Sequence, residues 1–102
     1  MKIIKHISEM IEDELDGAEE YIKDAVKLKE EYPELAKVFY DISLQEMNHV
    51  DMLHTQVAQF IRTHREEKGE PPAAMMAVYE YLHEKHIDRA AKIKGLQHTF
   101  KG

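Results

Sequence analysis

Residues 35–60 read LAKVFYDISLQEMNHVDMLHTQVAQF, and one helical face of this stretch decides the fold. Its positions alternate four and three residues apart: Leu35, Phe39, Ile42, Glu46, His49, Leu53, Gln56 and Phe60. This spacing is typical of the buried seam of an amphipathic helix. Two ionisable side chains, Glu46 and His49, occupy its centre, where burying an unpaired charge would cost on the order of several kcal/mol. A bound metal ion would remove that cost.

A second apolar stripe lies beside the first on the same helix. Its members are Tyr40, Met47, Val50, Val57 and Ile61. An apolar arc this wide indicates contact with more than one neighbouring helix. If the second stripe faced the core, Glu46 and His49 would lie at the edge as an ordinary, partly solvated polar pair, and the sequence leaves both orientations open.

A first helix is predicted over about residues 3–31. Its seam repeats the four-three spacing through Ile4, Ile7, Ile11, Glu14, Ala18, Tyr21, Ala25 and Leu28. Glu14 again stands where an apolar residue is expected. Gly17, in mid-helix, costs about 1 kcal/mol relative to alanine, and we interpret it as allowing a neighbouring backbone to approach closely.

Proline and glycine mark the breaks between helices. Pro33 suits the first turn of a second helix over about residues 33–67. Gly69 and Pro72 separate it from a third helix over about residues 72–94. Gly95 is a candidate for its end, and the sequence leaves open whether residues 96–102 fray or continue the helix weakly. The short connection before Pro33 predicts that the first two helices pack antiparallel. The chain is thus expected to form one all-α domain of three helices.

Composition excludes several classes of protein. The chain has 102 residues, no cysteine and a formal net charge of −6. Disulfides, thiolate zinc sites and iron–sulfur centres are therefore excluded, and nucleic acid is not an expected partner. No apolar run approaches the roughly 18 residues of a membrane span, and the N-terminus lacks a signal-peptide pattern. We expect a cytoplasmic protein.

The antiparallel pair brings Glu14 near Glu46 and His49. Straight helices leave an offset on the order of 9 Å, which the loop geometry could absorb. Carboxylates with an imidazole bind iron, manganese or zinc. One lone Glu and one Glu-x-x-His are half the ligand set of a di-iron bundle, so two chains would supply the whole. We therefore expect a homodimer or higher homo-oligomer, in which dimerisation completes a four-helix core.

Glu14, followed seven residues later by Tyr21, and the motif Glu46-Met47-Asn48-His49 resemble the first half of the rubrerythrin branch of the ferritin-like superfamily. The resemblance covers about residues 4–61, and the short chain resembles encapsulated ferritins, whose sites form between chains inside a protein compartment. It implies that Glu14, Glu46 and His49 ligate a di-iron centre and that Tyr21 supports one of these ligands. The implied activity is oxidation of Fe(II) with oxygen or peroxide, as a ferroxidase or peroxidase-type oxidoreductase.

The third helix departs from this pattern. Glu80 and His83 form a second Glu-x-x-His, which with His86 would complete the site in place of a second chain. No fourth helix follows, and there is no cysteine-rich electron-transfer module. These departures favour an alternative, a metal-free helical interaction module on a ferritin-like scaffold. His54, His64 and His98 are expected to be solvated.

Overall fold

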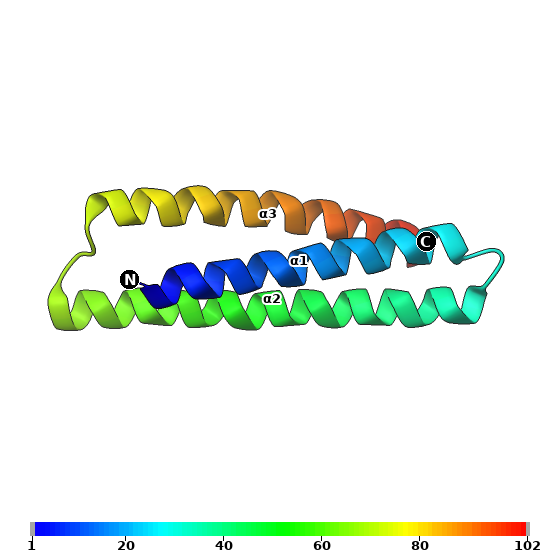
Figure 1. Cartoon of the computed structure of the whole chain (residues 1–102), viewed down its shortest axis with the longest axis horizontal. Coiled ribbons are helices and arrows are strands. Elements are labelled where there is room, and N and C mark those ends of the chain that lie inside the picture. The colour runs from blue at the N-terminus through cyan, green and yellow to red at the C-terminus, as the bar shows by residue number, and fades with distance from the viewer. Residues whose placement is uncertain (1, 102) are drawn as a thin grey trace.

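The computed structural model describes residues 2–101 and is all-helical in that range. Three helices follow one another: α1 (Lys2–Leu28), α2 (Pro33–Lys68) and α3 (Ala73–Lys101). They lie side by side in an elongated bundle of 56 × 19 × 17 Å (Figure 1). The α1–α2 pair is antiparallel, as the short connection predicted. The α3 helix runs in the same direction as α1 and opposite to α2.

The helix ends follow local chemistry. The α1 helix ends at Leu28, earlier than predicted, and the amide of Tyr32 donates to the carbonyl of Leu28 (2.8 Å) in the turn that follows. Pro33 opens α2, where its missing amide costs nothing. Gly69 ends it with φ of +83°, a backbone conformation that favours glycine.

The third helix is longer than the predicted range of 72–94 and takes the continuation past Gly95 that the sequence left open. The helix passes through Gly95 and continues to Lys101. Ile93, Gln97 and Phe100 are buried on one face of this last stretch, so packing against the rest of the bundle outweighs the low helix propensity of one glycine.

The core of the bundle contains the second apolar stripe of α2, the one that includes Met47 and Val50. Its buried residues are Ala36, Ser43, Met47, Val50, Val57 and Ile61. Of the two orientations that the sequence left open, the structure has the one that places the seam from Leu35 to Phe60 at the edge, and Leu35 and Phe60 are 44% and 38% exposed. The α1 stripe is turned similarly, because Leu15 and Ile22 are fully buried while Glu14 and Tyr21 are only half-buried.

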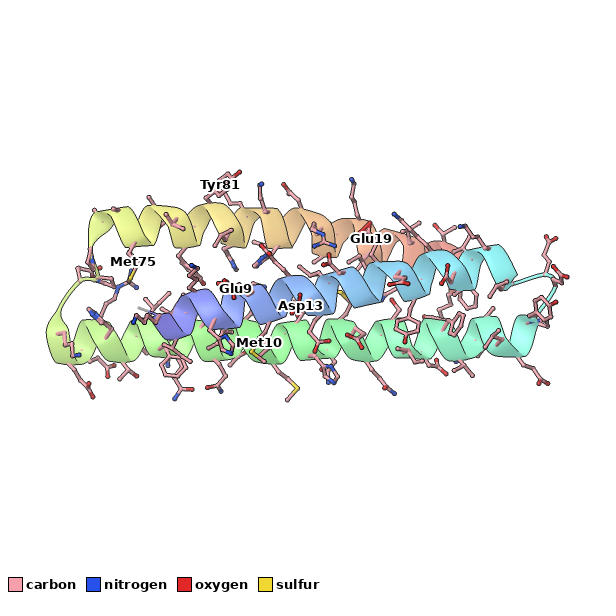
Figure 2. All side chains as sticks on the ribbon, in the orientation of Figure 1. Glu9, Met10, Asp13, Glu19, Met75 and Tyr81 are labelled. Carbon is pink, nitrogen blue, oxygen red and sulfur yellow. The ribbon has the colours of Figure 1, made fainter. Side chains whose placement is uncertain are left out.

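Polar contacts join the three helices inside the bundle. The buried hydroxyl of Ser43 donates to the carbonyl of Ala18 (2.8 Å) and accepts a hydrogen bond from Nε2 of Gln97 (2.9 Å). At the α1–α3 junction, Arg89 pairs with Asp16 (2.8 Å) and Glu19 (3.3 Å), and Figure 2 shows Glu19 at that junction. These contacts fix the rotation of each helix about its axis.

Within residues 2–101, no helix is both long and apolar enough to cross a membrane.

Candidate metal site

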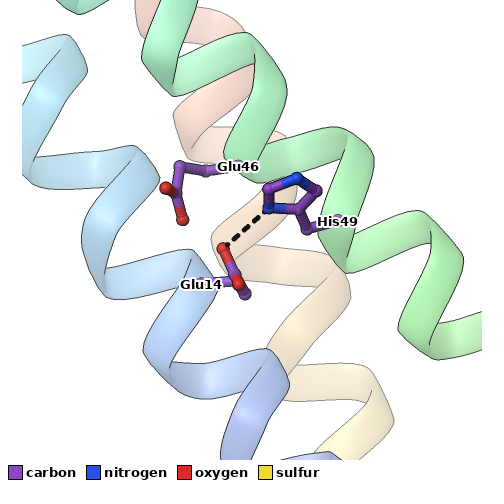
Figure 3. Close-up of side chains that lie close together, drawn as sticks. All are labelled: Glu14, Glu46 and His49. Atoms are coloured by element: carbon purple, nitrogen blue, oxygen red, sulfur yellow. Dashed lines mark hydrogen bonds and ion pairs between the residues drawn. The ribbon is translucent and has the colours of Figure 1, made fainter.

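Glu14 of α1 and Glu46 and His49 of α2 converge across the hairpin (Figure 3). Glu14 precedes the end of α1 at Leu28 by 14 residues, and Glu46 follows the start of α2 at Pro33 by 13. The two carboxylates are therefore nearly level. The offset expected from the sequence disappears because α1 stops three residues before the predicted end and the turn takes up the difference.

The three side chains offer ligand atoms that all lie within 4.8 Å of one another. Nδ1 of His49 lies 3.3 Å from Oε2 of Glu14. The side chains of His49 and Glu14 are 50% and 29% exposed, so the cluster opens to the surface. Within residues 2–101 this is the one group of three such ligands at that spacing.

Gly17 makes room for the carboxylate of Glu46. A Cβ atom at Gly17 would lie 3.2 Å from Oε2 of Glu46, closer than ordinary van der Waals contact. The sequence predicted a close approach at this glycine, but we attributed it to a neighbouring backbone. The approaching group is a side chain, and Gly17 thereby belongs to the site.

The closeness of the two carboxyl groups favours protonation of Glu46. A hydrogen bond that protonated Glu46 donates to Glu14, the partial removal from water and the negative charge of Glu14 together raise the pKa of Glu46 to about 7, and only His49 opposes them. Two close carboxylates cannot both ionise without a compensating cation. The donor set of two carboxylates and one imidazole thus fits a metal ion, whose charge would replace that of the proton on Glu46.

The other predicted site residues lie elsewhere. The ring of Tyr21 packs against Phe39 with centroids 5.5 Å apart, as a packing residue does. Glu80 is exposed on α3, and the ring of His83 packs against that of His54. In Figure 3 α3 passes behind the α1–α2 pair, on the far side from the three ligands. Within this chain, α3 therefore does not complete the cluster.

The sequence reasoning misjudged His54. We expected it to be solvated, but its ring lies against His83 (centroids 5.0 Å apart) and His86 (5.8 Å). A signal was present, since His54 is four residues after Val50 and three before Val57, on the stripe that the core uses. His98 is exposed as predicted, and His64 lies 3.1 Å from the carbonyl of Gly69 through its Nδ1.

Comparisons with protein-family models, with curated proteins and with solved structures give no match for this chain. What the structure defines is an all-α, three-helix protein with a carboxylate–imidazole cluster open on one face. The function must be inferred from that cluster and its surroundings.

Proposed function

We propose that this is a ferritin-like di-iron carboxylate protein that binds iron and oxidises Fe(II) with oxygen or peroxide. The observation that carries the proposal is the convergence of Glu14, Glu46 and His49 from two antiparallel helices. These residues are oxygen and imidazole donors, which suit iron, with manganese or zinc as alternatives.

The proposed site is shared between two copies of the chain. One chain offers two carboxylates and one imidazole, and a two-fold axis at the open face would give four carboxylates and two imidazoles. Exposed apolar side chains lie on this face of the hairpin. Met10, one turn before Glu14, is 41% exposed, Leu35 is 44% exposed and Phe60 is 38% exposed. Figure 2 shows Met10 over the α1–α2 junction. Burying such residues favours association.

In this proposal each residue has a role that its position supports. Glu46 would be the ligand shared by two ions, while Glu14 and His49 would each hold one. The anionic oxygens of the carboxylates favour Fe(III), the product, over Fe(II). Oxidation of two Fe(II) ions supplies two electrons. Together with two protons, these electrons reduce one oxygen molecule to hydrogen peroxide. If the oxidant is hydrogen peroxide, they reduce it to two water molecules.

The proton on Glu46 links iron loading to pH. Because the pKa of Glu46 is raised to about 7, a large fraction of the metal-free sites holds this proton at neutral pH. Iron binding must release it, as ligation requires the carboxylate form.

The test is an anaerobic Fe(II) titration followed by admission of oxygen, with the mass in solution measured by light scattering. We expect saturable binding of about one iron per chain, a dimer or a larger even-numbered assembly, and rapid oxidation. Glu46→Ala should slow oxidation at least about 100-fold, because loss of even an indirect partner of a metal typically costs 10–100-fold. Glu20→Ala, an exposed carboxylate of α1, is the matched control.

Two results would contradict the proposal. One is the absence of saturable iron binding in the wild-type protein. The other is oxidation by Glu46→Ala at the wild-type rate.

A second candidate function is a metal-free helical interaction module. The observation that favours it is the rotation of α2, which buries Met47 and Val50 and leaves Glu46 and His49 at the edge of the core. It predicts that Glu46→Leu leaves stability unchanged or raises it, whether or not iron is present. A loss of iron-dependent stability in that variant would exclude it.

A further inference from the structure

Three histidines form a second cluster between α2 and α3. His54 comes from α2, and His83 and His86 come from α3. The His54 ring meets both others edge to face, with centroids 5.0 Å from His83 and 5.8 Å from His86. The three rings line an open pocket of about 370 Å³, together with Asp51 and other residues of both helices.

Each ring of this histidine cluster has a buried nitrogen without a hydrogen-bond partner. These atoms are Nδ1 of His54, Nδ1 of His83 and Nε2 of His86, the last of which has only a longer ionic contact of 3.5 Å to Oε1 of Glu12. His86 is only 3% exposed. Unpaired buried polar atoms are uncommon in folded proteins, and three in one place point to a group that would bind them.

Burial also sets the charge of the rings. Removal from water lowers the pKa of His54, with the nearby imidazoles of His83 and His86 adding to the effect. Removal from water likewise lowers the pKa of His86, although Glu12 opposes it. A neutral imidazole is the form that ligates a metal.

The distances of the His54 ring from those of His83 and His86 fit a shared ion. Two imidazoles bound to one tetrahedral ion through metal–nitrogen bonds of about 2.1 Å have centroids about 5 Å apart. His83 and His86 are three residues apart, so they are neighbours on one helix face. A half-turn of an imidazole about its Cβ–Cγ bond exchanges nitrogen and carbon positions without moving the ring centre. The nitrogens can therefore turn toward a common ion while the helices stay in place.

We infer that His54, His83 and His86 form a second metal site, which takes one divalent transition-metal ion such as Zn²⁺. Oε1 of Glu12 lies 3.5 Å from Nε2 of His86 and supplies a carboxylate beside the ligands. The ion would join α2 to α3, the two helices with the least direct contact in the bundle. This site therefore fastens α3 to the hairpin and is separate from the Glu14–Glu46–His49 cluster.

The test is titration of the full chain with Co²⁺ alone, a spectroscopic substitute for Zn²⁺. Four-coordinate Co²⁺ absorbs visible light much more strongly than the hydrated ion, so the geometry is read directly. We expect the strong absorption to saturate at about one Co²⁺ per chain and to disappear when Zn²⁺ is added. His83→Ala should weaken binding at least about 100-fold, since it removes a ligand.

Matched variants separate this site from other binding. His98→Ala removes an exposed histidine of the same helix, and Glu46→Ala disables the carboxylate cluster. Both should keep the strong Co²⁺ absorption. His54→Gln, which approximately preserves side-chain volume, should lose it, and circular dichroism checks that each variant keeps its helices.

Three results would overturn the inference. The first is that the wild-type protein gives only the weak absorption of six-coordinate Co²⁺. The second is that folded His83→Ala or His54→Gln binds Co²⁺ as tightly as the wild type, and the third is that Glu46→Ala loses the strong absorption. The last result would assign the ion to the carboxylate cluster instead. Iron oxidation is measured in parallel, and we expect His83→Ala to retain it, so failure of one site does not imply failure of the other.

Discussion

The α2 helix carries side chains that could ligate a metal ion on both flanks of its buried stripe, and the two flanks differ in what covers them. On one flank, Glu46 and His49 meet Glu14 at an open surface. On the other, His54 meets His83 and His86 beneath α3. On the open flank, Glu14 raises the pKa of the Glu46 carboxyl group, whereas on the covered flank each imidazole has one buried nitrogen without a hydrogen-bond partner.

The packing around each cluster determines which further groups it would require to hold a metal ion. The covered flank already has ligands from two helices of the same chain, so an ion there would strengthen the fold. The open flank has ligands from the hairpin alone, and its exposed apolar neighbours favour a second copy as the missing half. The same helix can thus serve an internal and an intermolecular site because its two flanks have different surroundings.

The largest expected effect contrasts neighbouring residues of α1. Leu15 is fully buried, so Leu15→Ala should lower the free energy of unfolding by about 2–5 kcal/mol. Glu14→Ala should leave the metal-free protein as stable or make it more stable, because it relieves the repulsion with Glu46. Urea unfolding followed by circular dichroism measures both. Equal losses in the two variants would mean that Glu14 belongs to the core after all.

A smaller effect concerns pH at the open flank. The pKa of Glu46 is raised in the folded state, so folding favours the protonated form. The stability of the metal-free protein should therefore fall as pH rises from about 4.5 to about 7, and the loss is complete above that range. Linkage gives about 1.4 kcal/mol per unit of pKa, and exposure to solvent reduces the expected total to about 1–2 kcal/mol.

Glu46→Gln removes this titration while keeping the side-chain size. Unfolding of the wild type and of the variant at pH 5 and pH 8, with a chelator present, isolates the contribution of Glu46 from that of the histidines. The variant should lose less stability than the wild type between these pH values. An identical loss would show that the pKa of Glu46 is not raised.

The smallest effect is expected at Gly17. Alanine should add up to about 1 kcal/mol of helix stability, while its Cβ would stand 3.2 Å from Oε2 of Glu46. The carboxylate ends a flexible side chain at an open surface, so it can shift at little cost. Gly17→Ala should therefore raise metal-free stability by about 0.5–1 kcal/mol and weaken iron binding, as calorimetry would measure. Unchanged iron affinity would show that the space at Gly17 is not needed.

The helices and the carboxylate cluster follow from the sequence for identifiable reasons. Pro33 and Gly69 act on the local backbone, so the positions of the breaks between helices depend on the nearby sequence and not on tertiary packing. The three-residue spacing of Glu46 and His49 puts them on one helix face, and the short turn forces Glu14 to meet them. These are local constraints, and the structure confirms them.

The tertiary structure decided what depends on helix rotation and cover. Both stripes of α2 carry large apolar residues, and a bound metal ion would make burial of Glu46 and His49 possible, so the sequence alone leaves both orientations open. Packing of Ile93 and Phe100 carries α3 across Gly95, and its course beside α2 encloses His54 with two other histidines. Periodicity fixes which residues share a face, but only the neighbouring helices determine which face is buried, and that choice separates a solvated histidine from one enclosed between helices.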